Sequence, residues 1–250
     1  MKLDELVNYT SEYLSLKDIK DYPNAVNGLQ VEGSEEVEKI MTAVDGSSSS
    51  INAAAKWGAD MLIVHHGILW NGLKPIVGPL KARLAPLIKN DISLYSAHLP
   101  LDAHPDIGNN AVLADLIGLE VTDTFGEYQG IKIGVYGSLD ITLEELTEKV
   151  ETALDTTVNV VPSGSNKLSK VAIVSGGGAD SIAEAYDMGI DTLLTGECSH
   201  QEYIEAEELG INVIYAGHYA TETVGVRALG THLAEKFGIE HKFFDYPTGL

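Results

Sequence analysis

The chain has 250 residues, of which 37 are acidic and 16 are basic, and its formal net charge is −21 at pH 7. This excess of negative charge repels a phosphate backbone, and the few basic residues are scattered, so nucleic-acid binding is disfavoured although a small anionic substrate is not. No apolar run approaches the roughly 20 residues that cross a bilayer, and the acidic start of the chain is unlike a targeting peptide. The single cysteine, Cys198, excludes an intrachain disulfide. We therefore expect a cytoplasmic protein.

Short apolar strands alternate with helices in the first hundred residues. A buried strand is predicted over Lys39–Asp45, and a helix with a serine start and an alanine face over Ser48–Lys56. Strands over Met61–His66 and Ile92–His98 flank a helix over Leu80–Lys89. This alternation predicts parallel strands joined by right-handed crossovers.

The centre of the chain has a different character. A strand is predicted over Ile131–Ser138, an amphipathic helix over Leu143–Leu154 and a strand over Val158–Val161, before a turn at 162–166. We expect a small α+β insert or the start of a second domain.

The alternation resumes after this segment. A strand over Lys170–Ser175 runs into Gly176–Gly178, which lack the spacing of a dinucleotide-binding loop, so a tight turn is favoured over a phosphate cradle. The remaining elements predicted are helices over Ala179–Met188 and Gln201–Leu209, a helix from about Thr221 to Phe237, and strands over Thr192–Thr195, Asn212–Ala216 and His241–Asp245.

The two series of elements share residues as well as order. The segment Gly58–His66 has the pattern Gly-x-Asp-x-Leu, as does Gly189–Glu197, and the segments Tyr95–Asp102 and Tyr215–Glu222 both carry a histidine four residues before a carboxylate. Any two βαβαβ segments look broadly alike, but the shared residues favour an internal duplication. The chain then divides into a first α/β half at 1–120, a central α+β segment at 121–165 and a second α/β half at 166–250.

Residue types that bind metal follow the predicted strands. Ligands of open parallel sheets bind beyond the carboxyl ends of the strands. His65 and His66 stand at such an end, where the turn at Gly67 lets both side chains reach one site or two adjacent metals. Taken alone, a His-His pair is more often structural than functional.

The repeated histidine and carboxylate strengthen this prediction. Pro100 disfavours a helix at the preceding residue, so we expect His98 and Asp102 to lie on a loop. His218 and Glu222 enter the last long helix, and a carboxylate in its first turn is placed to bridge two cations. Four such residues at equivalent strand ends predict a metal site.

The sequence resembles the Nif-three-like proteins, also called the GTP cyclohydrolase I type 2 family. The matching stretches span nearly the whole chain in the order of the family and are Asn27–Val31, Ala43–Asp45, His65–Gly67, Tyr95–Asp102, Gly196–Glu197 and Gly217–Glu222. The resemblance implies an α/β fold of two duplicated halves, with a dinuclear metal site between them at the carboxyl ends of the strands. It also implies a homo-oligomer, a toroidal hexamer.

The resemblance also implies a ligand set. His66 and Asp102 would bind one divalent ion, His65 and His218 the other, and Glu222 would bridge both. Mixed imidazole and carboxylate ligands suit Zn, Fe, Mn, Co or Ni, and affinity alone does not choose among them.

Two metal ions about 3.5–4 Å apart favour hydrolysis, because they activate water and stabilise developing charge. We therefore expect a hydrolase acting on a small nucleotide-like or heterocyclic substrate. The alternative is a non-catalytic metal-binding scaffold or a metallochaperone-like oligomer. Binding of nucleic acid through a central pore is a third interpretation, which the charge opposes.

Candidate catalytic residues surround the predicted ligands. They are Glu222, His98 and Glu197, with His200 and Asp45 as further partners. His98 faces the cavity if it is the counterpart of His218, or else it hydrogen-bonds a loop carbonyl. Cys198 has no basic partner at a diagnostic spacing, which disfavours a nucleophilic role.

Overall fold

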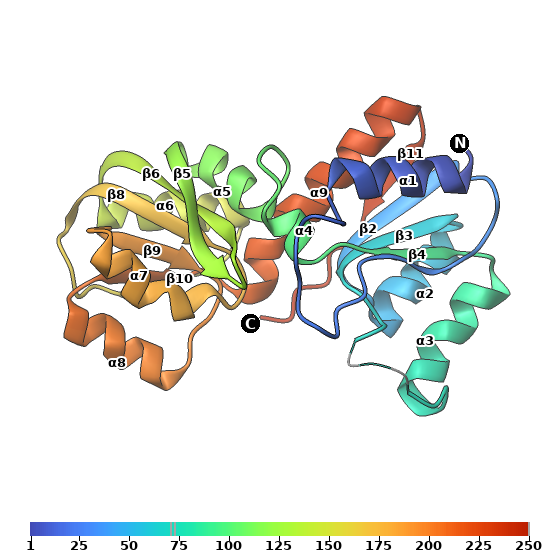
Figure 1. Ribbon diagram of the computed structural model, residues 1–250, viewed down its shortest axis with the longest axis horizontal. Coiled ribbons are helices and arrows are strands. Elements are labelled where there is room, and N and C mark those ends of the chain that lie inside the picture. Colours follow the sequence, from blue (N-terminus) through green and yellow to red (C-terminus); the bar gives the residue numbers. More distant parts are fainter. Residues whose placement is uncertain (71, 73, 250) are drawn as a thin grey trace. The chain divides into compact units, whose positions relative to one another are not determined.

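A computed structural model describes residues 1–70, 72 and 74–249. Two compact units form, each a mixed α/β structure around its own sheet (Figure 1). Unit 1 comprises Met1–Leu101 and Gly225–Tyr246, and unit 2 comprises Asp102–Val224 and the chain from Pro247 onward. The division into halves and a central segment inferred from the sequence stays a prediction about how the chain is built.

Unit 1 contains a five-stranded sheet of order β1-β4-β3-β2-β11. Its strands are parallel except β1, which pairs antiparallel with β4. The elements of this unit are α1 (Leu3–Tyr13), β1 (Gly28–Val31), β2 (Lys39–Asp45), α2 (Ser48–Trp57), β3 (Met61–His66), α3 (Gly78–Lys89), β4 (Ser93–Ser96) and β11 (Glu240–Phe243), with all but the last residue of α4 (Leu99–Asp102) and most of α9 (His218–Phe237).

Helices cover both faces of this sheet, with α2 and α3 on one side and α1 and α9 on the other (Figure 1). On the first face, Leu62 and Val64 of β3 pack with Ile51 of α2 and Leu87 of α3. On the second, the hydroxyl of Tyr95 in β4 hydrogen-bonds Ser11 of α1 at 3.0 Å. The near-continuous apolar runs of these strands follow from burial on both faces.

Unit 2 contains a six-stranded sheet of order β5-β6-β8-β9-β10-β7, in which β8, β9 and β10 are parallel. The elements are α5 (Asn109–Ile117), β5 (Glu120–Tyr128), β6 (Ile131–Thr142), α6 (Leu143–Leu154), β7 (Asn159–Val161), β8 (Lys167–Val174), the 3₁₀ helix η1 (Gly178–Ser181), α7 (Ile182–Asp187), β9 (Thr192–Thr195), α8 (His200–Leu209) and β10 (Asn212–Tyr215).

Successive residues of β8 show the two faces of this sheet. Val171 and Ile173 pack with α5 and α6, whereas Ala172 and Val174 pack with α7 and α8. Because side chains alternate along a strand, one buried strand supports both helical layers.

The Gly-x-Asp-x-Leu repeat has the same structural role in both units. Asp60 Oδ2 accepts hydrogen bonds from two backbone N–H groups beside the start of β2, at 2.8 and 2.9 Å. Asp191 Oδ2 accepts the equivalent pair near the start of β8, at 2.7 and 2.8 Å. Gly58 and Gly189 both have left-handed backbone angles, with φ of +74° and +64°. Each aspartate thus ties its strand to the neighbouring parallel strand.

Most predicted elements are confirmed, with differences at their ends. The predicted bounds of β2, β3, β9 and α6 match the structure, but β4 ends two residues before His98, and the helix expected over Ala179–Met188 is divided into η1 and α7. The elements α1, β1, α5 and β5 were not predicted. Within the described residues, no helix is both long enough and apolar enough to cross a membrane.

The prediction that His98 and Asp102 lie on a loop is wrong for Asp102, because Leu99–Asp102 forms the short helix α4. Pro100 is its second residue. Proline is tolerated in the first turn of a helix, where the backbone N–H needs no intrahelical acceptor.

Gly230 lets α9 approach β11 closely, so we expect Gly230→Ala to lower the free energy of unfolding by about 1–2 kcal/mol. The added Cβ would overlap the ring of His241, which a hydrogen bond to Thr42 Oγ1 at 2.9 Å holds in place. This overlap outweighs the higher helix propensity of alanine, worth about 1 kcal/mol. Urea unfolding of EDTA-treated protein measures the change. Thr231→Ala, on the exposed side of the same helix, is the control, and equal stability of both variants would contradict the expectation.

Candidate metal centre

Three histidines of unit 1 form a compact cluster. His65 and His66 are the last residues of β3, and His98 directly precedes α4. Each offers a ring nitrogen, and these three atoms lie within 4.8 Å of one another. His65 and His98 are buried and His66 is half-buried. Imidazole nitrogens at this spacing could hold a metal ion.

Each ring in this cluster is held through its Nδ1 atom by an oxygen. The pairs are His65 with the Ala97 carbonyl at 2.9 Å, His66 with Asp45 Oδ1 at 3.0 Å, and His98 with Asp21 Oδ1 at 2.8 Å. A carbonyl or carboxylate oxygen only accepts, so Nδ1 carries the proton and Nε2 of the neutral ring carries the lone pair. Metal-binding histidines are commonly fixed in this way.

Asp21 is a buried anion that positions His98. Burial disfavours its charged form, but hydrogen bonds from His98 and from Asn27 Nδ2, the latter at 2.7 Å, more than compensate and lower the pKa of the carboxyl group. Asn27 also accepts the backbone N–H of His98 at 2.8 Å. The carboxylate therefore stays ionised and fixes the imidazole orientation.

Two aromatic rings border the histidine cluster. The ring centroids of Tyr22 and Trp70 lie 5.6 and 5.0 Å from that of His98. Trp70 meets His98 edge-on, at an interplanar angle of 83°. Both rings pack against His98, which is 8% exposed.

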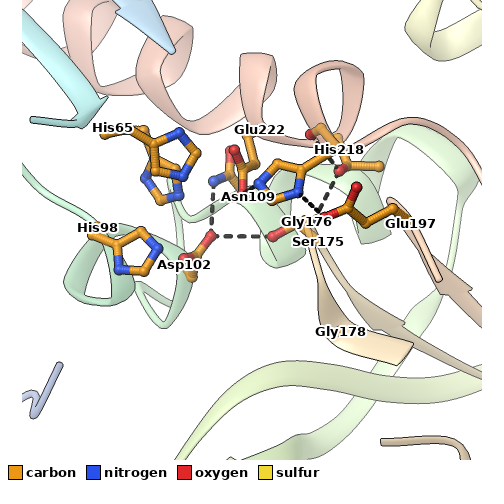
Figure 2. Close-up of polar contacts among 12 residues, drawn as sticks. His65, His98, Asp102, Asn109, Ser175, Gly176, Gly178, Glu197, His218 and Glu222 are labelled. Atoms are coloured by element: carbon orange, nitrogen blue, oxygen red, sulfur yellow. Dashed lines mark hydrogen bonds and ion pairs between the residues drawn. The ribbon is translucent and has the colours of Figure 1, made fainter. Parts of the chain in front are cut away.

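In unit 2, Asp102 is held at the end of α4 (Figure 2). Its Oδ1 atom accepts hydrogen bonds from Asn109 Nδ2 at 2.8 Å and from Ser175 Oγ at 3.1 Å. All three side chains are buried. These bonds set the direction of the carboxylate, which is the requirement for an oxygen ligand in a preformed site.

His218 lies between two carboxylates at the start of α9. Its Nδ1 atom is 2.9 Å from Glu197 Oε1 (Figure 2), and its Nε2 atom is 3.0 Å from Glu222 Oε1. The hydrogen bond to Glu222 raises the pKa of His218 to about 9 against the opposing effect of burial, and Glu197 adds to the rise. This arrangement attracts a cation to Nε2, whether a proton or a metal ion.

Gly176 makes room for this pair. A Cβ atom here would overlap Glu222 Oε1 and lie 3.3 Å from His218 Nε2, and the residue has a φ of +63°. Its carbonyl accepts the N–H groups of Gly196 at 2.9 Å and Glu197 at 3.1 Å. The glycine run thus forms a tight turn packed against the loop that carries Glu197.

The predicted residues fall in both units. His65, His66 and His98 belong to unit 1, and Asp102, Glu197, His218 and Glu222 belong to unit 2. The Nδ1 atom of His98 bonds a carboxylate and not a loop carbonyl, which corrects that alternative. His200 is exposed at the start of α8, and Cys198 packs at the edge of an apolar cluster.

The sequence did not reveal the residues that orient these side chains. Asp21 lies 77 residues before His98, and Ser175 lies 73 residues after Asp102. Asn27 stands in a stretch that matches the family, but its side-chain role had no local signal. Contacts over such separations require the folded chain.

Comparison with known proteins shows extensive similarity. A sequence profile described as Duf34/NIF3 (NGG1p interacting factor 3) matches residues 1–248. The GTP cyclohydrolase 1 type 2 homolog of Archaeoglobus fulgidus is 46% identical over 252 residues, covering 100% of both chains. The homolog of the same name from Deinococcus radiodurans is 44% identical over 250 residues, covering 99% of this chain and 94% of its own.

Solved structures share the fold. TTHA1606 from Thermus thermophilus matches with a TM-score of 0.92 and 41% identity over 100% of both chains. Reduced HcgD from Methanocaldococcus jannaschii matches with a TM-score of 0.86 and 31% identity over 98% of both chains. The predicted α/β fold is thereby confirmed.

Proposed function

The chain belongs to the Duf34/NIF3 family, as the resemblance of its sequence suggested, and we propose that it is a dinuclear-metal hydrolase. Its substrate would be a small nucleotide-like or heterocyclic molecule, in keeping with relatives named GTP cyclohydrolase 1 type 2 homolog. In this proposal His66 and Asp102 would hold one divalent ion, His65 and His218 would hold the other, and Glu222 would bridge the two.

One observation supports this proposal above others. The three histidines proposed as ligands, His65, His66 and His218, each hold Nδ1 against an oxygen acceptor, at distances of 2.9 to 3.0 Å. Histidines that bind metal through Nε2 almost always donate the Nδ1 proton to an oxygen in this way, so the shared orientation of the three rings supports metal binding. The donor set of imidazoles and carboxylates fits Zn, Fe, Mn, Co or Ni.

The side chains suggest a division of labour. When bound, two divalent ions supply Lewis acidity and make water more acidic. Glu197 holds the Nδ1 proton of His218, and Asp21 holds that of His98. In our proposal the Nε2 atom of His98 accepts a proton from water and returns it to the leaving group, because Asp21 stabilises the imidazolium between these steps.

The test combines metal analysis with a hydrolysis screen. Protein purified without added metal should contain two metal ions per chain and should hydrolyse at least one nucleotide or related heterocycle. EDTA treatment should abolish the activity, and reloading with the metal found should restore it. Two bound ions without hydrolysis of any compound would support the metal-binding scaffold, and a chain that binds no metal would overturn the proposal. The toroidal hexamer and the cytoplasmic location stay predictions.

A further inference from the structure

Unit 2 contains a pocket of about 740 Å³ next to the residues that position His218. This volume is typical of small-molecule sites. Its walls include Asn159 of β7, Tyr215 of β10, Tyr203 of α8, Tyr219 of α9 and the loop residue Glu197. Glu197 is the residue whose carboxylate holds the Nδ1 proton of His218 (Figure 2). The pocket therefore adjoins the proposed metal ligand.

A buried hydroxyl in the pocket wall points to a ligand. Tyr215 is only 7% exposed, and its Oη atom has no hydrogen-bond partner among the described residues. Burial raises the pKa of this phenol, and the adjacent Cys198 thiol adds to the rise, so the hydroxyl keeps its proton and can donate it to a ligand. A neutral phenol buried without a partner costs about 1–3 kcal/mol, which a ligand acceptor would recover.

The lining selects the kind of ligand. None of the described residues that line the pocket is lysine, arginine or histidine, and Glu197 contributes negative charge. A phosphate group would find no cation there and would be repelled. The lining includes three tyrosines, of which Tyr203 is 40% exposed and can stack on a ring. Stacking of this kind is worth about 1–3 kcal/mol per base in nucleic-acid-binding proteins.

We propose that this pocket binds the flat, neutral heteroaromatic ring of the substrate, and that Tyr215 Oη donates a hydrogen bond to an acceptor on that ring. This inference rests on the proposed function, because it takes the ligand of the pocket to be the substrate of the hydrolase. It narrows the substrate class to a nucleobase-like heterocycle. Any phosphate of the substrate lies outside the pocket. Tyr215 is thus a specificity-determining residue.

Nucleoside binding to the whole chain tests the inference by isothermal titration calorimetry. Guanosine, adenosine, cytidine and uridine serve as neutral probes, with and without EDTA. At least one nucleoside should bind saturably, and about 10 mM inorganic phosphate should not compete, because the pocket offers a phosphate no cation. Tyr215→Phe should weaken its binding about three- to tenfold, as expected for one neutral hydrogen bond, and Tyr203→Ala at least about fivefold. Tyr186→Phe is the matched control, because Tyr186 is 50% exposed on α7 and does not line the pocket.

One result separates a binding role of Tyr215 from a structural one, and two separate this inference from the proposed function. Tyr215→Phe should keep the metal content and the thermal unfolding midpoint of the wild type, since it removes a hydroxyl that has no protein partner among the described residues. The inference would be overturned if none of the four nucleosides binds, or if both pocket variants bind a nucleoside as tightly as the wild type does. Either outcome would leave the metal proposal standing. Nucleoside binding that depends on the pocket in a chain that holds no metal would support the inference and refute the proposed function.

Discussion

Glu222→Ala is expected to remove both metal ions, with an affinity loss of more than about 100-fold. Changes to residues that only orient a ligand cost about 10- to 100-fold, and Glu222 is proposed to touch both ions directly. It is 3% exposed, and its Oε1 atom lies 3.0 Å from His218 Nε2. Elemental analysis of protein purified without added metal measures the effect, and circular dichroism checks that the fold is kept.

Glu235→Ala is the matched control for this substitution. Glu235 is an exposed carboxylate on the same helix, so its loss should leave the metal content unchanged. In metal-free protein, Glu222→Ala should also lower the pKa of His218 from about 9, because its hydrogen bond is the largest cause of the rise. Undiminished metal content would refute the bridge, and hydrolysis that survives the substitution would indicate a different active site.

Gly176→Ala is expected to weaken metal binding about 10- to 100-fold without contributing or removing a ligand. The added methyl group would displace the Glu222 carboxylate, because three hydrogen bonds to the Gly176 carbonyl and one from its N–H to Thr221 Oγ1 hold the backbone in place. A left-handed alanine also costs about 1–2 kcal/mol of folding free energy. Metal titration and urea unfolding measure the two effects.

The neighbouring glycine provides the control. Gly177 has a φ of −87°, and the nearest atom to an added Cβ would be Glu197 Oε1 at 3.8 Å, an ordinary contact. Gly177→Ala should therefore keep wild-type metal affinity. If both alanine variants bind metal equally well, the Gly176 turn does not shape the site.

Local patterns predicted the strands and helices that carry the site. Buried parallel strands such as β3 are continuous apolar runs, and a strand ends where its apolar run meets a turn, so His65 and His66 were placed correctly. The helix α4 was missed because the rule for residues before proline is a preference, which the first turn of a helix can override. The strand β5 carries mostly exposed side chains, so it lacked the apolar pattern of a buried strand.

The sequence alone determined the α/β class, the repeated Asp60 and Asp191, and the residue types available for a metal, because these depend on periodicity and on short motifs. Only the tertiary structure decided which atoms of those residues make hydrogen bonds and which residues are their partners. The partners of His98 and Asp102 include residues more than 70 positions away in the chain. The buried hydroxyl of Tyr215 likewise became visible only in the fold, because burial and hydrogen-bond geometry arise when distant segments pack together.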